Sequence, residues 1–376
     1  MNVLIAPDSF KGSLQASEVA CAIGDALTTL SPKLTLTLCP ISDGGDGMID
    51  VLKQLKNTTE KTMMVHSADM TLRQASYLLH GTTAYIEMAQ CSGLNTINLN
   101  QTNALKTTTY GVGEMVLDTL KYKVKTIVVG LGGSATNDGG IGLLDALGYK
   151  MLDKANRILS PVGENLEKIH TIDDTNAFKF PKDVTIKIIT DVNTPLYGAT
   201  GAAKIFGPQK GLNNEEINRL DLGLQHYASI IKAHTQKDFS HIKGCGAAGG
   251  LSIAFLAFLH ATIEPGIDYI FKILQIEDLI KSHDIIITAE GKIDQQTHHD
   301  KAPLGVINLA NKHRKKIMVL GGQITENVTP LNVDLMRAIH PKSLKIEQML
   351  DPLTTKIHIK KTLYSLKSFF INNDPY

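Results

Sequence analysis

The sequence predicts an α/β fold with two domains, on three observations. Strands alternate with helices near both ends of the chain, strands follow one another without helices in part of the middle, and the chain has 376 residues. Alternation is typical of a parallel sheet, because parallel neighbours need a long crossover connection. Consecutive strands without helices indicate antiparallel pairing. A chain of this length is too long for one small core and suits two domains of common size.

Hydrophobic periodicity predicts the first strands and helix. Residues 3–6 form a short apolar run that is typical of a buried strand. A helix is expected to end at Leu30 and to start near Ser13 or Ser17, either of which can cap it. In residues 34–38 leucine alternates with threonine, which predicts a second strand.

The alternation of strands and helices stops near Thr58, where strand-like runs appear without intervening helices. Residues 75–79 and 83–88, joined around Gly81, predict a β-hairpin. The alternation of strands and helices returns at Asp284. The other expected strands are 126–129, 186–190, 285–288 and 317–320, and the other expected helices are 112–120, 214–232, 251–260, 304–313 and 351–370.

The composition is that of an ordinary soluble globular protein, with 43% hydrophobic and 20% charged residues. A net charge of +1 gives no electrostatic reason to expect nucleic acid or an anionic membrane as partner. No signal peptide is visible and no apolar run is long enough to span a membrane, so we expect a cytoplasmic protein. The four cysteines form no CxxC pair and are expected to be reduced and buried.

Polar, glycine-containing turns are expected at the ends of six predicted strands. Glycine lets the backbone approach a ligand, and helix N-termini favour anions such as phosphate. The turns also hold carboxylates, which suit Mg²⁺, and lysines, which can neutralise a moving phosphoryl group. This combination favours Mg–nucleotide chemistry over hydride transfer. The turns are residues 8–12, 42–47, 130–140, 191–195, 289–294 and 321–323.

Structural roles remain open for several of these residues. Asp8 and Asp43 can also be helix caps or turn formers, and Lys210 and Lys301 can also be solvated. The run of residues 298–300 (His-His-Asp) lacks helical i, i+4 spacing and a second cluster, so it favours a surface or site edge over a metal site.

Standard nucleotide fingerprints give mixed signals. The P-loop pattern is absent from the sequence. Residues 130–135 match GxGxxA after a strand, and Asp153 lies at about the expected distance, which supports the alternative of an NAD-dependent oxidoreductase of a small hydroxy acid. The same residues loosely resemble the phosphate loop of the galactokinase–homoserine kinase group. A second GxGxxG at residues 244–249 follows no clear strand and is weak.

Together the turns resemble the type-1 glycerate kinase family of bacteria. The matching stretches run in the family's order and span nearly the whole chain, and several are long and rare. They are residues 6–13 (APDSFKGS), 43–47 (DGGDG), 132–140 (GGSATNDGG), 206–211 (FGPQKG), 246–250 (GAAGG) and 290–297 (EGKIDQQT).

The resemblance implies phosphorylation of D-glycerate with ATP and Mg²⁺, and it favours 2-phosphoglycerate as the product. It also implies a flavodoxin-like parallel-sheet domain made of residues 1–58 and 284–376, with a mixed α/β domain, residues 59–283, inserted between them. The active site is then expected in the cleft between the domains, where closure can exclude water. The oligomeric state, including a homodimer, stays open, and a sugar-acid sensor without enzymatic activity is a third alternative.

Residue roles follow as hypotheses from this resemblance. Asp191 is the expected base or orienting carboxylate, and Lys11 and Lys292 are expected to hold the substrate carboxylate or the transferring phosphate. Magnesium is assigned to Asp43 and Asp191. The further substrate contacts are Asp43, Asp46, Ser9, Asn193 and Asp294, and the nucleotide contacts are Gly132, Gly133, Ser134, Asn137, Asp138 and Lys210.

The chain departs from the family pattern at four positions. Asp46 stands where Glu is usual, which keeps the charge. Lys292 replaces a usual Arg, and a lysine cannot bind an anion in the bidentate way that a guanidinium can. Ala289 and Asp300 stand where Gly is usual, and Asp300 adds bulk and negative charge to its loop. We expect a divergent but active member of the family, in which Ala289, Lys292 and Asp300 are the departures that bear on substrate choice.

Overall fold

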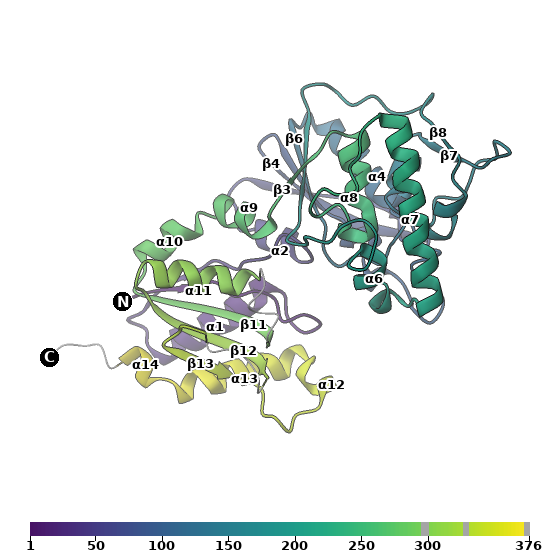
Figure 1. Cartoon of the computed structure of the whole chain (residues 1–376). Helices are drawn as coiled ribbons and strands as arrows, with labels where there is room; N and C mark the ends of the chain where they lie inside the picture. Colours follow the sequence, from purple (N-terminus) through teal and green to yellow (C-terminus); the bar gives the residue numbers. More distant parts are fainter. Residues whose placement is uncertain (295–300, 326–330, 372–376) are drawn as a thin grey trace. The chain divides into compact units, whose positions relative to one another are not determined.

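The computed structural model describes residues 1–294, 301–325 and 331–371, which belong to two compact units (Figure 1). The first unit contains Met1–Asp43, Asp50–Gln54 and Ile267–Tyr376. The second unit contains Gly44–Ile49 and Leu55–Gly266. Both ends of the chain therefore belong to one unit, and the second unit is formed by the middle of the chain.

The boundaries of these units differ from the predicted positions 58 and 284. Helix α10 (Ile276–Ser282) packs against β1 (Asn2–Ile5) and α11 (Ala302–Lys312) of the first unit, and its Ile276 and Ile280 are fully buried. The sequence prediction placed the boundary at the next strand, because a helix that precedes a strand carries no sign of the sheet it covers. At the other boundary the chain returns briefly to the first unit, at Asp50–Gln54.

The first unit is built on a five-stranded parallel sheet with the order β13-β12-β11-β1-β2. Counted along the chain within this unit, the order is 2-1-3-4-5, which is the flavodoxin-like order. The predicted flavodoxin-like sheet is therefore confirmed. Its strands are β1 (Asn2–Ile5), β2 (Thr35–Leu38), β11 (Ile285–Ile293), β12 (Lys316–Ile324) and β13 (Leu335–Ala338).

Helices pack together in two pairs around this sheet. Helices α1 and α13 contact each other, and so do α10 and α11. Val3 and Ile5 share one buried cluster with residues of α1 and α13, including Ile23 and Ile359. Besides α10, the helices of this unit are α1 (Ala16–Leu30), α11 (Ala302–Lys312), α12 (Ile346–Met349), α13 (Pro352–Ser365) and α14 (Ser368–Ile371). Helices α2 (Met48–Leu52) and α9 (Gly266–Ile273) each cross a unit boundary.

Helix α1 begins at Ala16, and neither predicted serine caps it. The Glu18 carboxylate accepts a hydrogen bond of 3.1 Å from the Gln15 N–H instead. Ser17 Oγ donates to the Asp50 carboxylate, 2.6 Å away, and Ser13 Oγ lies 2.9 Å from Thr355 Oγ1. Both serines are thus used in tertiary contacts.

Two of the six predicted turns are wrong, because the strands continue through them. Strand β11 extends to Ile293 and β12 to Ile324, and these two residues pair directly. The glycines serve close packing here: a Cβ added to Gly322 would lie 2.3 Å from the carbonyl oxygen of Gly291. Glycine in these strands therefore marks a close approach of backbones rather than a chain reversal.

The second unit is built on a mixed six-stranded sheet, with the order β10-β9-β6-β5-β4-β3. Strands β3, β4 and β5 pair antiparallel, whereas β5, β6, β9 and β10 pair parallel. The predicted hairpin is confirmed, with His80 opposite Thr83. The strands are β3 (Thr58–His66), β4 (Leu72–His80), β5 (Thr83–Glu87), β6 (Thr126–Gly130), β9 (Thr185–Ile189) and β10 (Thr262–Glu264), with a separate pair, β7 (Lys150–Leu152) and β8 (Thr171–Asp173).

The second unit has its own hydrophobic core, which includes buried residues of β5, β6 and β9 and of the helices α4, α7 and α8. Helix α8 is interrupted by three residues with left-handed, non-helical backbone, Ala248, Gly249 and Gly250, so its long regular part follows the glycine run, as predicted from residue 251. The elements are α3 (Ala89–Ser92), α4 (Tyr110–Thr119), α5 (Ile141–Ala146), α6 (Ala202–Phe206), α7 (Asn214–Thr235), α8 (Ala247–Phe258) and the 3-10 turns η1 (Leu94–Thr96), η2 (Leu120–Tyr122), η3 (Gly163–Lys168) and η4 (Pro208–Lys210).

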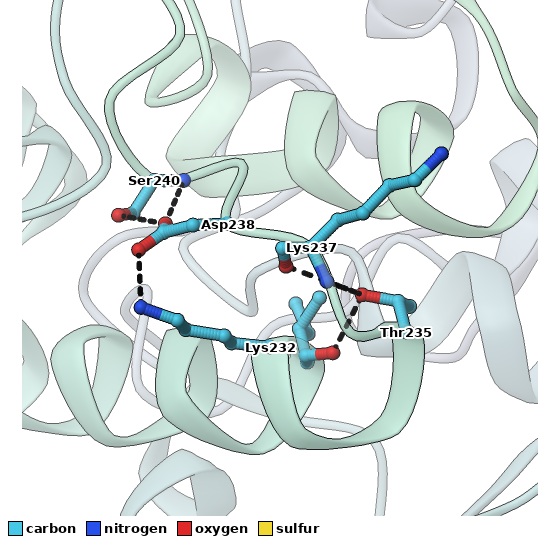
Figure 2. A network of polar contacts seen from close by, with 6 residues as sticks. Lys232, Thr235, Lys237, Asp238 and Ser240 are labelled. Atoms are coloured by element: carbon cyan, nitrogen blue, oxygen red, sulfur yellow. Dashed lines mark hydrogen bonds and ion pairs between the residues drawn. The ribbon is translucent and has the colours of Figure 1, made fainter.

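A polar network closes the C-terminal end of α7 (Figure 2). The Asp238 carboxylate accepts hydrogen bonds from the N–H and Oγ of Ser240 and from Lys232 Nζ. These bonds, that of Ser240 Oγ first, lower the pKa of Asp238 to about 2. The carbonyl of Ser240 in turn accepts from the Cys245 thiol at 3.0 Å, which links the network to the segment that enters α8.

All four cysteines are free thiols, and three of them, Cys39, Cys91 and Cys245, are buried, whereas Cys21 is exposed. The prediction of buried cysteines is therefore wrong for Cys21. Among the described residues, no helix has the length and apolar character that crossing a membrane requires.

Candidate functional site

A cavity of about 500 Å³ lies in the first unit at the carboxyl ends of the parallel strands. Five residues that the sequence analysis selected line it: Ser9, Lys11, Asp43, Lys292 and Asp294. They come from the turn after β1, the loop after β2 and the end of β11. Ligands of open α/β sheets bind at this edge, beside the point where the strand order reverses. The fold thus brings together residues that are far apart in the sequence.

Asp8 is the most perturbed carboxylate of this cavity. Burial raises the pKa of Asp8 to about 7, and the negative charges of Asp43 and Glu290 add to the rise, against a hydrogen bond from the Ser9 N–H. The Asp8 N–H donates to the carbonyl of Ala289, 2.9 Å away, which ties the turn to β11. A crowded, partly buried carboxylate of this kind is stabilised by a cation or by protonation.

Two lysines of the cavity form ion pairs with its acids. Lys301 Nζ contacts Glu290 Oε1, and both side chains are largely buried. Lys292 Nζ lies 3.2 Å from Asp294 Oδ2, and the Lys292 side chain is 58% exposed. Lys292 is therefore accessible from solvent, whereas Lys301 is held in place.

Four further residues line the cavity: Asp8, Glu290, Lys301 and His340. The sequence analysis counted the first three among the carboxylates and lysines that suit phosphate chemistry, without a specific role for each, and Asp8 and Glu290 lie in the matching stretches. His340 follows β13 and lies in none of those motifs. A polar residue directly after a parallel strand was the only sign of it.

In the second unit the carboxyl ends of β5, β6 and β9 form one edge, because these strands are parallel neighbours. The Gly44–Gly47 turn packs against the loop after β6. A Cβ added to Gly132 would lie 2.5 Å from the Cα of Gly45 and 2.8 Å from the Asp46 N–H nitrogen. Two glycine turns predicted to bind ligand are thus in direct contact, and glycine at 132 is required for that contact.

Lys210 is buried in this loop, with 1% of its surface exposed, so the alternative of a solvated lysine is wrong. Its Nζ donates hydrogen bonds to Ser134 Oγ at 2.8 Å and to the carbonyl of Thr136 at 2.6 Å. Burial lowers the pKa of Lys210 to about 7, which the charge of Asp138 opposes. Lys210 therefore holds the loop in shape and does not lie on its surface.

Asp138 is fully buried and has a structural role in the same loop. Its carboxylate accepts hydrogen bonds from the N–H and Oγ1 of Thr109 and from the N–H groups of Gly140 and Gly142. Asn137 is also fully buried, and its side-chain amide has no partner among the described residues. The accessible part of the loop is its tip, Gly132 and Gly133.

Glu87, at the end of β5, is a residue that the sequence analysis missed. Its carboxylate accepts hydrogen bonds from the N–H groups of Gly47 at 3.0 Å and Ile49 at 3.1 Å, so it fixes the turn that carries Asp46. Burial raises the pKa of Glu87, and the neighbouring Asp46 adds to the rise. The sequence signal that could have identified Glu87 is an acidic residue at the end of an apolar strand.

Asp191 follows β9 at the same edge. Its Oδ1 accepts a hydrogen bond of 2.9 Å from the N–H of Gly266, and the side chain is partly exposed. Asn193, two residues later, is exposed. The geometry leaves Asp191 oriented and partly accessible, as an orienting carboxylate requires.

The dinucleotide fingerprint at residues 130–135 lacks its structural context. A dinucleotide-binding turn leads directly into a helix, whereas α5 begins only at Ile141. Asp153 follows β7, which pairs with β8 in a separate sheet. Its carboxylate binds Arg157 and the N–H of Ala155. Nothing in this arrangement supports the oxidoreductase alternative.

Within residues 1–294, 301–325 and 331–371, no group of three or more His, Cys, Asp or Glu side chains is arranged to hold a metal ion. Mg²⁺ in kinases usually takes only one or two carboxylates together with phosphate oxygens. The crowding of Asp8, Asp43 and Glu290 suits such a cation, because the charges of Asp43 and Glu290 disfavour the ionised form of Asp8. The run at 298–300, including Asp300, lies outside the described residues. Ala289 is buried in the hydrophobic core of the first unit.

Comparison with known proteins places these features in one family. Residues 3–367 match the model of the glycerate kinase family. The chain is 38% identical over 330 residues to glycerate 2-kinase of Escherichia coli K12, with 87% of each chain covered. It is 35% identical over 353 residues to a glycerate kinase of Halalkalibacterium halodurans, with 93% of each covered. A crystal structure described as glycerate kinase 2 from Salmonella typhimurium LT2 matches with a TM-score of 0.83 at 34% identity, covering 98% of both chains.

Proposed function

Because the chain belongs to the glycerate kinase family and is therefore a kinase, we propose that it phosphorylates D-glycerate with ATP and Mg²⁺ to give 2-phosphoglycerate. The observation that carries this proposal is the cavity of the first unit, where Lys11 and Lys292 lie beside Asp43 and Asp294. Cations suit the carboxylate of a hydroxy acid, and acids accept hydrogen bonds from its hydroxyls.

In this proposal the substrate carboxylate is bound by Lys11 and Lys292. The side chains of Ser9, Asp43 and Asp294 hold the hydroxyl groups, and Asp46 and Asn193 supply further contacts. Their fixed positions would reduce the entropy cost of bringing the hydroxyl to the phosphoryl group. Asp191 orients or deprotonates the attacking hydroxyl, which is a role for a partly accessible carboxylate.

The nucleotide phosphates are assigned to the loop after β6. The backbone N–H groups of Gly132 and Gly133 are its accessible donors, and Ser134 lies next to them. Asp138 and Lys210 contribute by keeping the loop in shape through their buried hydrogen bonds, and the buried amide of Asn137 is assigned to the same nucleotide site. Asp43 and Asp191 are the proposed carboxylate ligands of Mg²⁺, which when bound would neutralise charge on the phosphates.

A coupled assay of ADP formation from ATP, Mg²⁺ and D-glycerate tests the proposal. We expect turnover that requires both Mg²⁺ and D-glycerate, and no reduction of NAD⁺ with the same hydroxy acid. Nuclear magnetic resonance of the product distinguishes phosphate at the 2-position from phosphate at the 3-position. Absence of ADP with D-glycerate and related hydroxy acids would overturn the proposed activity, and a sensor would bind glycerate without releasing ADP.

A further inference from the structure

His340 lies between the cavity of the first unit and helix α13, and the proposed function does not yet use it. It lines the cavity and is 7% exposed. Its backbone N–H donates a hydrogen bond of 3.2 Å to the carbonyl of Gly322 in β12. The residue is thus fixed to the sheet at the edge where Lys11 and Lys292 also lie.

The ring of His340 is held by a second histidine. Its Nδ1 lies 2.8 Å from Nδ1 of His358, and the ring centroids are 5.1 Å apart with an angle of 65° between the planes. His358 is on α13, next to the fully buried Ile359, so its backbone is anchored in the core. A bond between two Nδ1 atoms needs one donor and one acceptor, which couples the protonation of the two rings.

The other ring nitrogen, Nε2, has no hydrogen-bond partner in the described part of the chain. Burial and the neighbouring His358 lower the pKa of His340, and burial followed by the charge of Lys361 lowers the pKa of His358. Both rings are therefore neutral near pH 7. When His358 donates its Nδ1 proton, His340 carries its own proton on Nε2. That proton is available to a ligand in the cavity.

We propose that His340 contacts the substrate directly, donating a hydrogen bond from Nε2–H to its carboxylate, and that His358 is a positioning residue that holds His340 in this tautomer. The inference rests on the proposed function, which supplies an anionic hydroxy acid. A neutral donor adds selectivity for a carboxylate at a place where Lys301 and Lys292 are already paired with acids.

Steady-state kinetics of four variants test the contact. His340→Ala should raise KM for D-glycerate about tenfold, as loss of one hydrogen bond predicts, with kcat within about twofold and KM for ATP unchanged. His340→Gln should restore most of the affinity, because its amide places an N–H near the position of Nε2–H. His358→Ala should raise KM in the same direction, and His358→Asn should restore it, because its amide replaces the Nδ1–H donor.

His283→Ala is the matched control. His283 is also a buried histidine of the first unit, 8% exposed, but both ring nitrogens are bonded, to the carbonyl of Leu279 and to Thr37 Oγ1. It is expected to lower the melting temperature without changing KM for D-glycerate. An unchanged KM in His340→Ala, or a His340→Gln variant no better than His340→Ala, would overturn the proposed contact.

Nitrogen-15 spectra of the imidazole groups, recorded with D-glycerate and without ATP, separate this inference from the proposed function. The His340 signals should show a proton on Nε2 and should shift when D-glycerate is added. Turnover of D-glycerate by the wild-type protein with an unmoved His340 signal leaves the kinase activity standing and overturns the contact. If the wild-type protein does not turn over D-glycerate, the proposed kinase activity is overturned. The same spectrum then decides the contact: a shift of the His340 signal supports it, and an unmoved signal refutes it.

Discussion

Lys210 Nζ donates a hydrogen bond of 2.8 Å to Ser134 Oγ, and this bond joins a buried lysine to the loop proposed to bind nucleotide phosphate. Lys210 donates a second hydrogen bond to the carbonyl of Thr136, so the lysine links two residues of the loop and fixes its shape. A phosphate loop must hold its backbone donors in place before the ligand arrives. These two hydrogen bonds explain why a lysine occupies this position, although burying its side chain costs free energy.

Lys210→Met should change the pH dependence of stability. The folded-state pKa of Lys210 is about 7, below its ordinary value of 10.5, so the unfolded chain binds more protons between these pH values. Wild-type stability should therefore rise with pH across this window, by up to about 1.4 kcal/mol per pH unit from this group, and fall as pH drops toward 7. Melting temperatures of wild type and Lys210→Met between pH 7 and 9.5 measure this, and parallel curves would contradict the assignment.

Glu290 and Lys301 should be coupled in a double-mutant cycle. Each side chain is largely buried, so Lys301→Met removes the ammonium group that pairs with a buried carboxylate and should cost about 3 kcal/mol or more of stability. The double variant Glu290→Gln with Lys301→Met should recover part of this loss. Denaturant unfolding measures the coupling, with the exposed pair Glu277 and Lys312 as the control, where about 0.5 kcal/mol is expected. Additive effects at Glu290 and Lys301 would refute the coupling.

The fold was largely predictable because it depends on patterns that extend over many residues. Apolar runs located β1 and β11, the alternation of leucine with threonine located β2, and two strand-like runs joined around Gly81 located the antiparallel β4–β5 hairpin. The extension of β11 through Gly291 was not predictable, since glycine followed by lysine is also typical of a turn. What keeps the chain extended is pairing with β12, a contact about 30 residues away in sequence.

The sequence motifs predicted which residues lie near the site, but they did not predict which of these residues can contact a ligand. Lys11, Asp43 and Lys292 were selected and do line one cavity. Asp138 and Lys210 were selected as ligand contacts, but both are buried inside the loop. Burial depends on the surrounding fold, and a sequence motif needs its supporting residues as much as its contact residues.

Lys292→Arg should lower KM for D-glycerate several-fold. The Lys292 ammonium makes a single contact with Asp294, whereas a guanidinium can bind that acid and still present donors to a carboxylate in bidentate fashion. Steady-state kinetics with D-glycerate and with a longer hydroxy acid measure both affinity and preference. Lys281→Arg, at an exposed ion pair of the first unit, is the control and should leave KM unchanged. A higher KM in Lys292→Arg would show that the lysine is matched to its ligand.

Asp191→Asn and Asp8→Asn distinguish two candidates for the carboxylate that acts on the substrate hydroxyl. Asp191 is oriented by the N–H of Gly266, and Asn keeps the shape while removing the charge and the ability to accept a proton. If Asp191 has the proposed role, Asp191→Asn should lower kcat by about 100-fold or more with the melting temperature unchanged. Asp183→Asn, just before the opposite end of β9, is the control and should keep full activity.

The pH profile of kcat/KM, which reports the pKa values of the enzyme without substrate, decides between them independently of the size of these effects. The pKa of Asp8 is raised to about 7 by burial and by Asp43, so a base at this position would lose activity as pH falls through about 7. No such limb is expected if Asp191 is the base and Asp8 serves in binding. An acid limb near pH 7 that disappears in Asp8→Asn, together with near-normal kcat in Asp191→Asn, would transfer the role from Asp191 to Asp8.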